Sequence, residues 1–296
     1  MSKCHALAAW LNHAPLVYRV VFVRGWTIRT GLLVALAIRS ASFAAWWEVL
    51  KINDRKDIHN SKVPVVCRAC EARHRGICGA LSADQLMELS KHTTKVVYSA
   101  ESEISPVGQN LPRQGNILSG VVKLSKLTAD GRQQIVGLQF APDFMGRPYS
   151  RQSEVTVEAA TDVKVCAFPA GTLENLMRET PELEHKLHEQ TLKELDEARN
   201  WMLTLGRKTA SEKVASFLYL IATHVDPEVD SADGAVSFDI PLKRSDIADF
   251  LGLTIETVSR QLTKLRHAGV INIHNNRTVE VPDVERLRHL TEQENA

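Results

Sequence analysis

The middle of the chain alternates between apolar and polar positions over short runs separated by turn signals, which is the pattern of β-strands. The strand-like runs occupy 115–127, 134–140, 155–160 and 163–168, and the hairpin signal Ala-Asp-Gly stands at 129–131. We expect the last two runs to pair with each other. The stretch from about Leu81 to Leu176 therefore predicts a small β-barrel or β-roll. It contains neither a catalytic triad nor a paired-carboxylate site, so we expect no enzymatic activity.

Between Pro181 and Gly206 the apolar residues change to the helical spacing of three and four. They are Leu183, Leu187, Leu195, Ala198, Met202 and Leu205. Six acidic residues and three basic ones lie within 181–200, so negative charge flanks the apolar stripe. The stripe fits either a helix packed on its own domain or a seam for a second copy. Because the helix separates a sensor-like β module from the segment described next, we favour dimerisation through Leu195, Ala198, Met202 and Leu205.

Residues 242–266 have the pattern of a helix–turn–helix. The first helix has a buried face of Ile247, Ala248 and Leu251, and Gly252 suits the left-handed turn residue. Thr254 is a good N-cap for the second helix. The core stripe of that helix is expected to be Ile255, Val258, Leu262 and Leu265. After Gly269, a tight hairpin that turns at Asn275-Asn276 predicts a wing.

The second helix presents Glu256, Ser259 and Arg260 on the face opposite its core stripe. A recognition helix meets base edges with this part of its surface. The Arg260 guanidinium can donate two hydrogen bonds to guanine, and the Glu256 carboxylate can accept a hydrogen bond from cytosine. We expect the DNA backbone to be contacted by Arg244, Thr254, Thr257, Lys264 and Arg277.

Three of the five cysteines follow the spacing Cys-x2-Cys-x7-Cys at Cys67, Cys70 and Cys78. This spacing brings thiolates onto one metal centre, and the neighbouring arginines and histidine would lower the thiol pKa values. A fourth ligand is then needed. His74 would complete a Cys3His zinc site, whereas Cys166 would complete the four thiolates of an iron–sulfur cluster. A redox disulfide is a third possibility, and Cys166 in its apolar strand could also be an ordinary buried cysteine.

Composition narrows the class of protein. The 296 residues are 44% hydrophobic and 24% charged, with a formal net charge of +1, which excludes collagen-like, disordered and polytopic membrane proteins. Five cysteines are too few for a disulfide scaffold and fit a reducing compartment, so we expect a cytoplasmic protein without a membrane partner. Residues 1–48 carry a net charge of +4 and the remainder −3, so nucleic-acid binding must come from a local patch.

Residues 1–62 differ from the rest of the chain. They hold four of the five tryptophans, and their longest apolar run is too short to span a membrane. Three interpretations stay open: a peripheral amphipathic segment, a cleaved leader, and an extension outside the functional domains. We favour the extension, and expect Cys4, which lies in it alone, to be a free thiol without a role.

The segment Gly-Leu-Thr-Ile-Glu-Thr-Val-Ser-Arg at 252–260 resembles the recognition element of the CRP/FNR superfamily, and Glu-x-x-Ser-Arg is the pattern of its FNR branch. The order of β-roll, long helix and winged helix–turn–helix is similar to that superfamily from about Cys67 to the C-terminus. FNR-type oxygen sensors hold a [4Fe-4S] cluster with three N-terminal cysteines and one central cysteine before a short proline-containing turn. Cys67, Cys70, Cys78 and Cys166 match this arrangement, and the x7 gap resembles the FnrN/FnrL-type proteins of alphaproteobacteria.

The resemblance implies an α+β chain of four parts. The first part is an N-terminal extension of uncertain role at 1–62. It is followed at 63–180 by a cluster-binding loop with a cyclic-nucleotide-binding-like β-roll sensor domain. A dimerisation helix at 181–206 then leads to a winged helix–turn–helix domain at 207–296. The implied protein is a homodimer that binds palindromic double-stranded DNA resembling TTGAT-N4-ATCAA. It would act mainly as an activator that touches RNA polymerase, with the hairpin 128–132 as one contact.

In the implied switch, oxygen degrades the cluster and acidic residues such as Asp196 and Glu197 push the helix seam apart. Cyclic-AMP-binding members carry a Gly-Glu-Leu phosphate cassette, whereas this chain has Gly-Arg-Pro-Tyr at 146–149. We therefore expect no cyclic nucleotide. Two alternatives remain: the same fold with a zinc or redox-thiol site that senses another signal, and an iron–sulfur electron carrier, against which the recognition helix argues.

Overall fold

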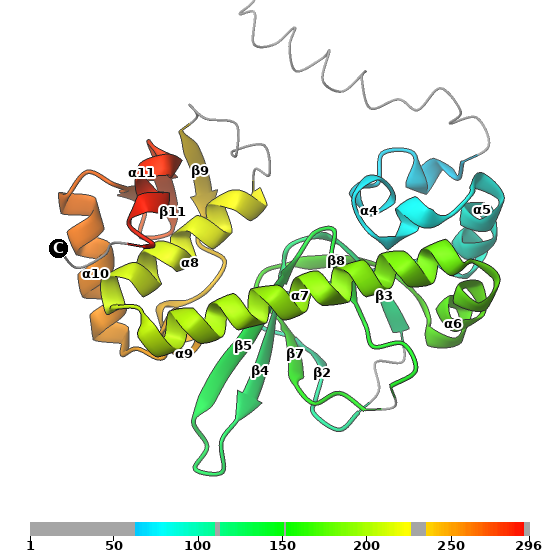
Figure 1. The fold of residues 1–296 in the computed structure, drawn as a ribbon, viewed down its shortest axis with the longest axis horizontal. Helices are drawn as coiled ribbons and strands as arrows, with labels where there is room; N and C mark the ends of the chain where they lie inside the picture. The colour runs from blue at the N-terminus through cyan, green and yellow to red at the C-terminus, as the bar shows by residue number, and fades with distance from the viewer. Residues whose placement is uncertain (1–62, 110–112, 151, 226–234, 293–296) are drawn as a thin grey trace, which may run out of the picture. The chain divides into compact units, whose positions relative to one another are not determined.

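The computed structural model describes residues 63–109, 113–150, 152–225 and 235–292 (Figure 1). The expectations for 1–62, including that for Cys4, lie outside these residues. The described residues belong to one compact unit, His59–Ala296. Within them, no helix is both long and apolar enough to cross a membrane.

The described chain begins with short helical turns, which we call the cysteine lobe (residues 63–80). They are η2 (Val65–Cys67), α4 (Glu71–His74) and η3 (Ile77–Ala80). Helix α5 (Ala83–His92) follows, and its start is fixed by a capping box. The Ser82 hydroxyl accepts from the Gln85 backbone nitrogen at 3.3 Å, and the Gln85 side chain accepts from the Ser82 backbone nitrogen at 2.9 Å. The lobe and α5 share one apolar cluster.

Eight strands of the described chain form two four-stranded antiparallel sheets. The first has the order β1 (Thr94–Tyr98), β8 (Val163–Pro169), β3 (Arg113–Ser119) and β6 (Phe144–Met145). The second has the order β2 (Glu103–Ser105), β7 (Thr156–Ala159), β4 (Val121–Leu127) and β5 (Gln133–Phe140). Buried residues of both sheets, among them Ile117, Val122, Val157 and Val165, form a common core. The predicted β-roll is confirmed.

The expected pairing of 155–160 with 163–168 is wrong, because β7 and β8 lie in different sheets. Strand β7 pairs with β2 and β4, whereas β8 pairs with β1 and β3. Two of the three residues between them, Thr161 and Asp162, are held by separate neighbours. The Thr161 hydroxyl accepts from the backbone of β4 at 3.0 Å, and the Asp162 carboxylate accepts from the Ala100 backbone nitrogen at 2.9 Å. The chain therefore crosses from one sheet to the other at this point.

Three helices follow the roll: α6 (Ala170–Glu179), α7 (Pro181–Arg207) and α8 (Ala210–Val225). Helix α7 is the long helix expected between Pro181 and Gly206 (Figure 1), and the proline stands in its first turn, where a missing N–H costs nothing. Its first turns pack on its own domain, because Leu183 is buried and Leu187 lies against the cluster that contains the cysteine lobe.

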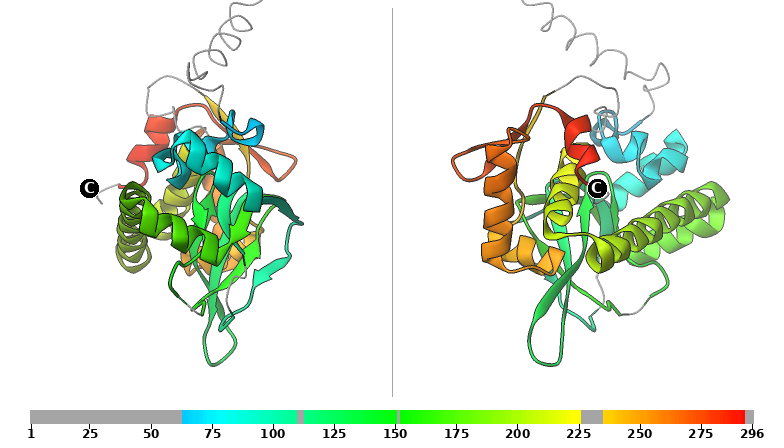
Figure 2. Two further views of the ribbon diagram at one scale, coloured as in Figure 1. Left: turned by 90° about the vertical axis from the view of Figure 1, so that its right-hand side faces the viewer. Right: turned by 60° about the vertical axis from the view of Figure 1, so that its left-hand side comes forward.

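The C-terminal part is a winged helix–turn–helix (Figure 2). It contains β9 (Val236–Asp239), α9 (Arg244–Leu251), α10 (Ile255–His267), β10 (Asn272–His274), β11 (Thr278–Val281) and α11 (Val284–His289). Helix α9 ends at Gly252 with a φ of 60°, as predicted, and the Thr254 hydroxyl caps α10 by accepting from the Thr257 backbone nitrogen at 3.2 Å. The wing turns at Asn275 and Asn276 with φ of 50° and 57°, the positive values that a tight hairpin requires.

The predicted core stripe of α10 is wrong at one position. Ile255 is 52% exposed, whereas Gln261 is 8% exposed and lies with Val258, Leu262 and Leu265 on the buried side. Ile255 is the first residue of the helix, so its side chain lies over the turn that precedes α10 rather than in the layer between α9 and α10.

Candidate functional site

The structure brings the four predicted cysteine ligands together from two distant parts of the chain. Cys67 ends η2, Cys70 is the N-cap of α4, Cys78 lies in η3 and Cys166 lies in β8. The Cys78 thiol is close enough to the other three to interact with them electrostatically, and Cys166 interacts in the same way with Cys67 and Cys70. Each of the four is a free thiol.

Tight backbone turns hold the first two cysteines close together in the lobe. The Cys67 backbone nitrogen donates to the Pro64 carbonyl at 2.8 Å, and the Cys70 backbone nitrogen donates to the Cys67 carbonyl at 3.4 Å. Gly76 then lets the chain pass from α4 to η3. A Cβ at this position would lie 2.9 Å from the Ala72 carbonyl oxygen and 3.0 Å from the Pro142 carbonyl oxygen, so a larger residue would displace Cys78.

Strand register places the fourth thiol. Cys166 stands opposite Lys95 of β1 and opposite Asn116 of β3. The neighbouring Gly115 allows this close approach, because a Cβ there would lie 2.2 Å from the Cys166 carbonyl oxygen. The Asn116 side-chain Nδ2 donates to Cys78 Sγ at 3.3 Å. Asn116 thus joins the strand that carries Cys166 to the lobe that carries Cys78.

Burial, rather than the basic neighbours, dominates the thiol chemistry. Burial first and the other three thiols second raise the pKa of the Cys78 thiol to about 12, and the Asn116 hydrogen bond opposes the rise. Burial and the nearby Cys70 and Cys67 raise the pKa of Cys166 to about 11. The pKa of Cys67 is also raised, by burial and by Cys70, although Arg73 lowers it. The expectation of lowered thiol pKa values is therefore wrong for Cys67 and Cys78, because it ignored their low-dielectric surroundings.

The alternative fourth ligand His74 lies exposed on α4. Among the residues that the structure describes, no three cysteine, histidine or acidic side chains are grouped tightly enough to hold a metal ion as they stand. The four thiols nevertheless lie close enough to interact electrostatically.

The predicted base-reading residues share an exposed surface. Glu256, Ser259 and Arg260 are all exposed on α10. Thr257 is half-buried, and its hydroxyl accepts from the Thr254 hydroxyl at 2.9 Å and from Arg260 Nη2 at 3.5 Å. The two threonines thus fix the first turn of the helix beneath the exposed side chains.

The predicted backbone-contacting residues lie around this surface. Lys264 is exposed on the same helix. Arg244 Nη2 donates to the Asn276 carbonyl at the wing turn at 3.3 Å, and partial burial lowers the pKa of Arg244. Arg277 Nε lies 3.6 Å from Asp239 Oδ2, and both side chains remain exposed. Arg244 therefore connects the helix–turn–helix to its wing.

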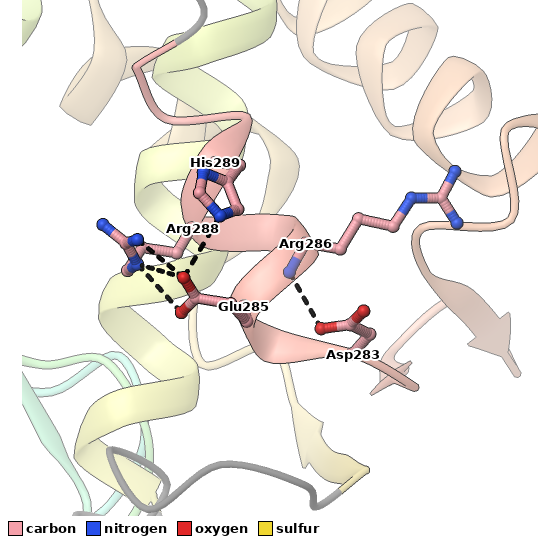
Figure 3. Close-up of polar contacts among 5 residues, drawn as sticks. All are labelled: Asp283, Glu285, Arg286, Arg288 and His289. Carbon is pink, nitrogen blue, oxygen red and sulfur yellow. Dashed lines mark hydrogen bonds and ion pairs between the residues drawn. The ribbon is translucent and has the colours of Figure 1, made fainter.

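Arg286 of α11 is a residue that the sequence reasoning missed. Its guanidinium donates to the Ala268 carbonyl at 2.9 Å and to the Gly269 carbonyl at 3.3 Å, directly after the last turn of α10. In Figure 3 the Arg286 side chain extends away from the pair formed by Glu285 and Arg288. A cation hydrogen-bonded to the end of a helix satisfies its last carbonyls and complements its dipole. No local sequence pattern predicts this contact, because Arg286 lies 17 and 18 residues from its two partners.

Three of the four predicted dimer residues are exposed in the second half of α7. Leu195 is 44% and Met202 73% exposed, Ala198 is exposed and Leu205 is half-buried. The large side chains Leu192 and Leu203, which were not predicted, are also exposed. Leu183 and Leu187, by contrast, pack on the chain's own domain. The interpretation as a helix packed on its own domain therefore holds for the first turns of α7, and the seam for a second copy stays a prediction for the exposed residues further along.

Two further predicted features lie on the roll. The hairpin 128–132 projects between β4 and β5, with Leu127 70% exposed at its base and Arg132 Nε 2.8 Å from Asp130 Oδ2. The segment 146–149 turns onto α6, where the Tyr149 backbone nitrogen donates to Glu174 at 3.3 Å.

Comparison with known proteins gives two family matches. Residues 98–180 match the cyclic nucleotide-binding domain family, and residues 212–290 match the Crp-like helix-turn-helix domain family. These two matches cover the roll and the winged helix–turn–helix.

Similar proteins cover most of the chain. A probable transcriptional activator of Rhizobium leguminosarum bv. viciae is 54% identical over 236 residues, which are 80% of this chain and 97% of that protein. The transcriptional activator protein FnrL of Cereibacter sphaeroides is 39% identical over 76% of this chain and 93% of that protein. The solved structure of FixK2 from Bradyrhizobium japonicum superposes with a TM-score of 0.60 at 31% identity, over 68% of this chain and 98% of that one.

Proposed function

Because the chain belongs to the CRP/FNR family of transcriptional regulators, we propose that it is a homodimeric transcriptional activator that binds palindromic DNA and senses oxygen through a [4Fe-4S] cluster. The observation that carries the oxygen-sensing part is the meeting of Cys67, Cys70 and Cys78 with Cys166, some ninety residues further along the chain. The names of the two similar proteins above, both transcriptional activators, support the regulatory part.

The donor set fits an iron–sulfur cluster better than a Cys3His zinc site. Four cysteines are near neighbours, whereas His74 is exposed. Four neighbouring thiolates, of which Cys78 is buried and the others are half-buried, would repel one another strongly unless cations lay between them. Bound there, a cluster would supply iron–sulfur bonds that are labile to oxygen.

Packing links the cysteine lobe to the long helix. Ile77 and Cys78 belong to the same buried cluster as Leu183 in the first turn of α7, and Leu187 packs against it. The position of the lobe and the position of α7 therefore depend on each other. Because Leu195 and Met202 lie exposed further along the same rigid helix, we propose that α7 transmits the state of the four thiols to the dimer seam.

The exposed face of α10 supports DNA binding. Arg260 and Glu256 would read guanine and cytosine edges in a half-site of the form TTGAT-N4-ATCAA, and two copies of α10 would read the palindrome. The exposed hairpin 128–132 would offer a contact to RNA polymerase.

The test is an anaerobic purification followed by exposure to air. We expect a brown protein with about four irons and four sulfides per chain, which binds the palindrome before air and loses both colour and affinity after it. A colourless protein with one zinc per chain would support the alternative regulator of another signal. A brown protein without DNA binding would support an electron carrier.

Single variants test the ligand set. Cys166→Ala should abolish the anaerobic chromophore, whereas His74→Ala and Cys4→Ala should keep it. Loss of the chromophore in His74→Ala with its retention in Cys166→Ala would overturn the assignment of Cys166.

A further inference from the structure

We propose that Asn116 is a positioning residue that holds the Cys78 sulfur by a hydrogen bond and tunes the cluster of the proposed function, on which this inference rests. Asn116 lies on β3, where it stands opposite Cys166 of β8 on one side and opposite Phe144 of β6 on the other. Its Nδ2 donates to Cys78 Sγ at 3.3 Å. The Asn116 amide thus contacts the Cys78 thiol, and Asn116 is also the strand partner of Cys166.

The surroundings of Asn116 are apolar. The side chain is 1% exposed, and Cys78, Phe144 and Phe168 belong to one hydrophobic cluster beside it. Among the described residues, its Oδ1 has no hydrogen-bond partner. A buried amide with an unsatisfied oxygen is less favourable in such a layer than an aliphatic side chain of the same size. Packing alone therefore does not account for an asparagine here, whereas a donor to sulfur does.

The hydrogen bond from Asn116 should shift the reduction potential of a bound cluster in one direction. An N–H donor stabilises a thiolate more than a neutral group, and it stabilises the more negative, reduced state of a cluster more than the oxidised one. Removing the donor should therefore lower the reduction potential and make the cluster easier to oxidise. Loss of such an outer hydrogen bond typically costs about 10–100-fold in metal affinity or activity.

Gln114 provides a matched control. It lies two residues earlier on β3, so its side chain points to the same face of the sheet. It is 4% exposed, and its Oε1 also has no partner among the described residues. Among those residues, Asn116 donates a hydrogen bond to a thiol and Gln114 does not. Gln114→Leu therefore removes a buried amide from the same face without removing a donor to sulfur.

The experiment compares full-length wild-type protein with Asn116→Leu, Asn116→Asp and Gln114→Leu, all purified without oxygen. The measurements are iron and sulfide content, the midpoint potential from a redox titration, the iron–thiolate stretching frequencies from resonance Raman spectra, and the half-life of the visible chromophore in air. We expect Asn116→Leu to load iron, to shift the Raman bands and lower the potential, and to shorten the half-life roughly tenfold, the lower end of the range for outer hydrogen bonds. Gln114→Leu should match the wild type.

Asn116→Asp covers the case in which Asn116→Leu does not fold, because aspartate has the shape of asparagine and lacks the Nδ2 donor. It should show the same shifts or lose iron altogether. Wild-type potential and half-life in the folded Asn116 variants would overturn the inference, as would equal changes in Gln114→Leu, which would indicate a general packing effect. Failure of the proposed function is distinguishable, because the wild-type protein itself would then carry no iron–sulfur chromophore.

Discussion

Asp143 lies in the turn before β6, where its carboxylate accepts a hydrogen bond from the Phe140 backbone nitrogen at 2.9 Å. Burial raises the pKa of this carboxyl above its ordinary value, and the Phe140 hydrogen bond, His224 and Lys193 oppose the rise only in part. His224 of α8 stacks on Phe140 with ring centroids 4.1 Å apart. The charged carboxylate therefore weakens a junction between the roll and α8 at neutral pH.

Asp143→Asn should raise the free energy of unfolding at pH 7, because the amide oxygen can still accept from Phe140 while the buried charge is gone. Since the carboxyl pKa is raised in the folded state, the folded protein binds this proton more tightly than the unfolded chain. The difference in the free energy of unfolding between Asp143→Asn and the wild type should thus become smaller as the pH falls from 7 toward 4. Denaturant titrations of both proteins across this range measure the difference, and a difference that is constant with pH would contradict the assignment.

At the scale of elements, we expect the exposed side chains of α10 to be divided between contacts to base edges and contacts to phosphates. Arg260→Ala should cost about 1–3 kcal/mol of binding and relax discrimination at the guanine of each half-site. Lys264→Ala should weaken all operators alike and reduce the salt slope by roughly one unit. The measurement is a set of single-base operator variants titrated without oxygen at several salt concentrations. An equal loss on consensus and guanine-substituted sites in Arg260→Ala would make Arg260 a phosphate contact.

The end of α10 depends on Arg286, whose guanidinium donates to the Ala268 and Gly269 carbonyls. Arg286→Ala should destabilise the last turn of the recognition helix by about 1 kcal/mol, because the bonds are charge-assisted but exposed. Faster hydrogen exchange of the backbone amides in the last turns of α10 would reveal this. Arg288→Ala is the control, since Arg288 pairs with Glu285 on its own helix (Figure 3), and it should leave those amides unchanged.

The helix–turn–helix was predictable because its determinants are local. Gly252 adopts a φ of 60° and Thr254 caps α10, each of which depends on the few residues around it. The strand partners of β7 and β8 were not predictable in the same way, since neighbours in sequence do not reveal which sheet a strand joins. The raised pKa values of the thiols were not predictable from the local sequence either, because the burial of Cys78 and Cys166 arises only when β8 meets the cysteine lobe.

At the scale of the whole described unit, a nearly buried ion cluster connects the roll to the helix–turn–helix. Lys123 of β4 has a side chain only 9% exposed, and its Nζ lies 3.1 Å from Asp246 of α9 and 3.7 Å from Glu158 of β7. The Gln134 side chain of β5 donates to the Phe250 carbonyl of α9 at 3.2 Å. The first helix of the helix–turn–helix is therefore held on the sheet by polar contacts that exclude most of the solvent.

Asp246 and Lys123 should be strongly coupled. Breaking a buried pair leaves an uncompensated charge, which costs about 3–5 kcal/mol, so Lys123→Met, which leaves Asp246 and Glu158 unpaired, should lower the free energy of unfolding by about 3 kcal/mol, the lower end of this range. Asp246→Asn should lower it by less, because Glu158 still lies 3.7 Å from Lys123 Nζ. The double variant should lose less than the sum, with a coupling energy of about 1–3 kcal/mol.

Denaturant titrations of the four proteins in this double-mutant cycle measure the coupling. Lys243→Ala is the control, because Lys243 pairs with Glu101 across the same junction at 2.5 Å while both side chains are about 60% exposed; an exposed pair contributes little. Because α9 supports the recognition helix, the single variants should also weaken operator binding on all sequences alike, without a change in base preference. Additive single losses would mean that Lys123 and Asp246 stabilise the fold independently, and the roll would then not hold α9 through this pair.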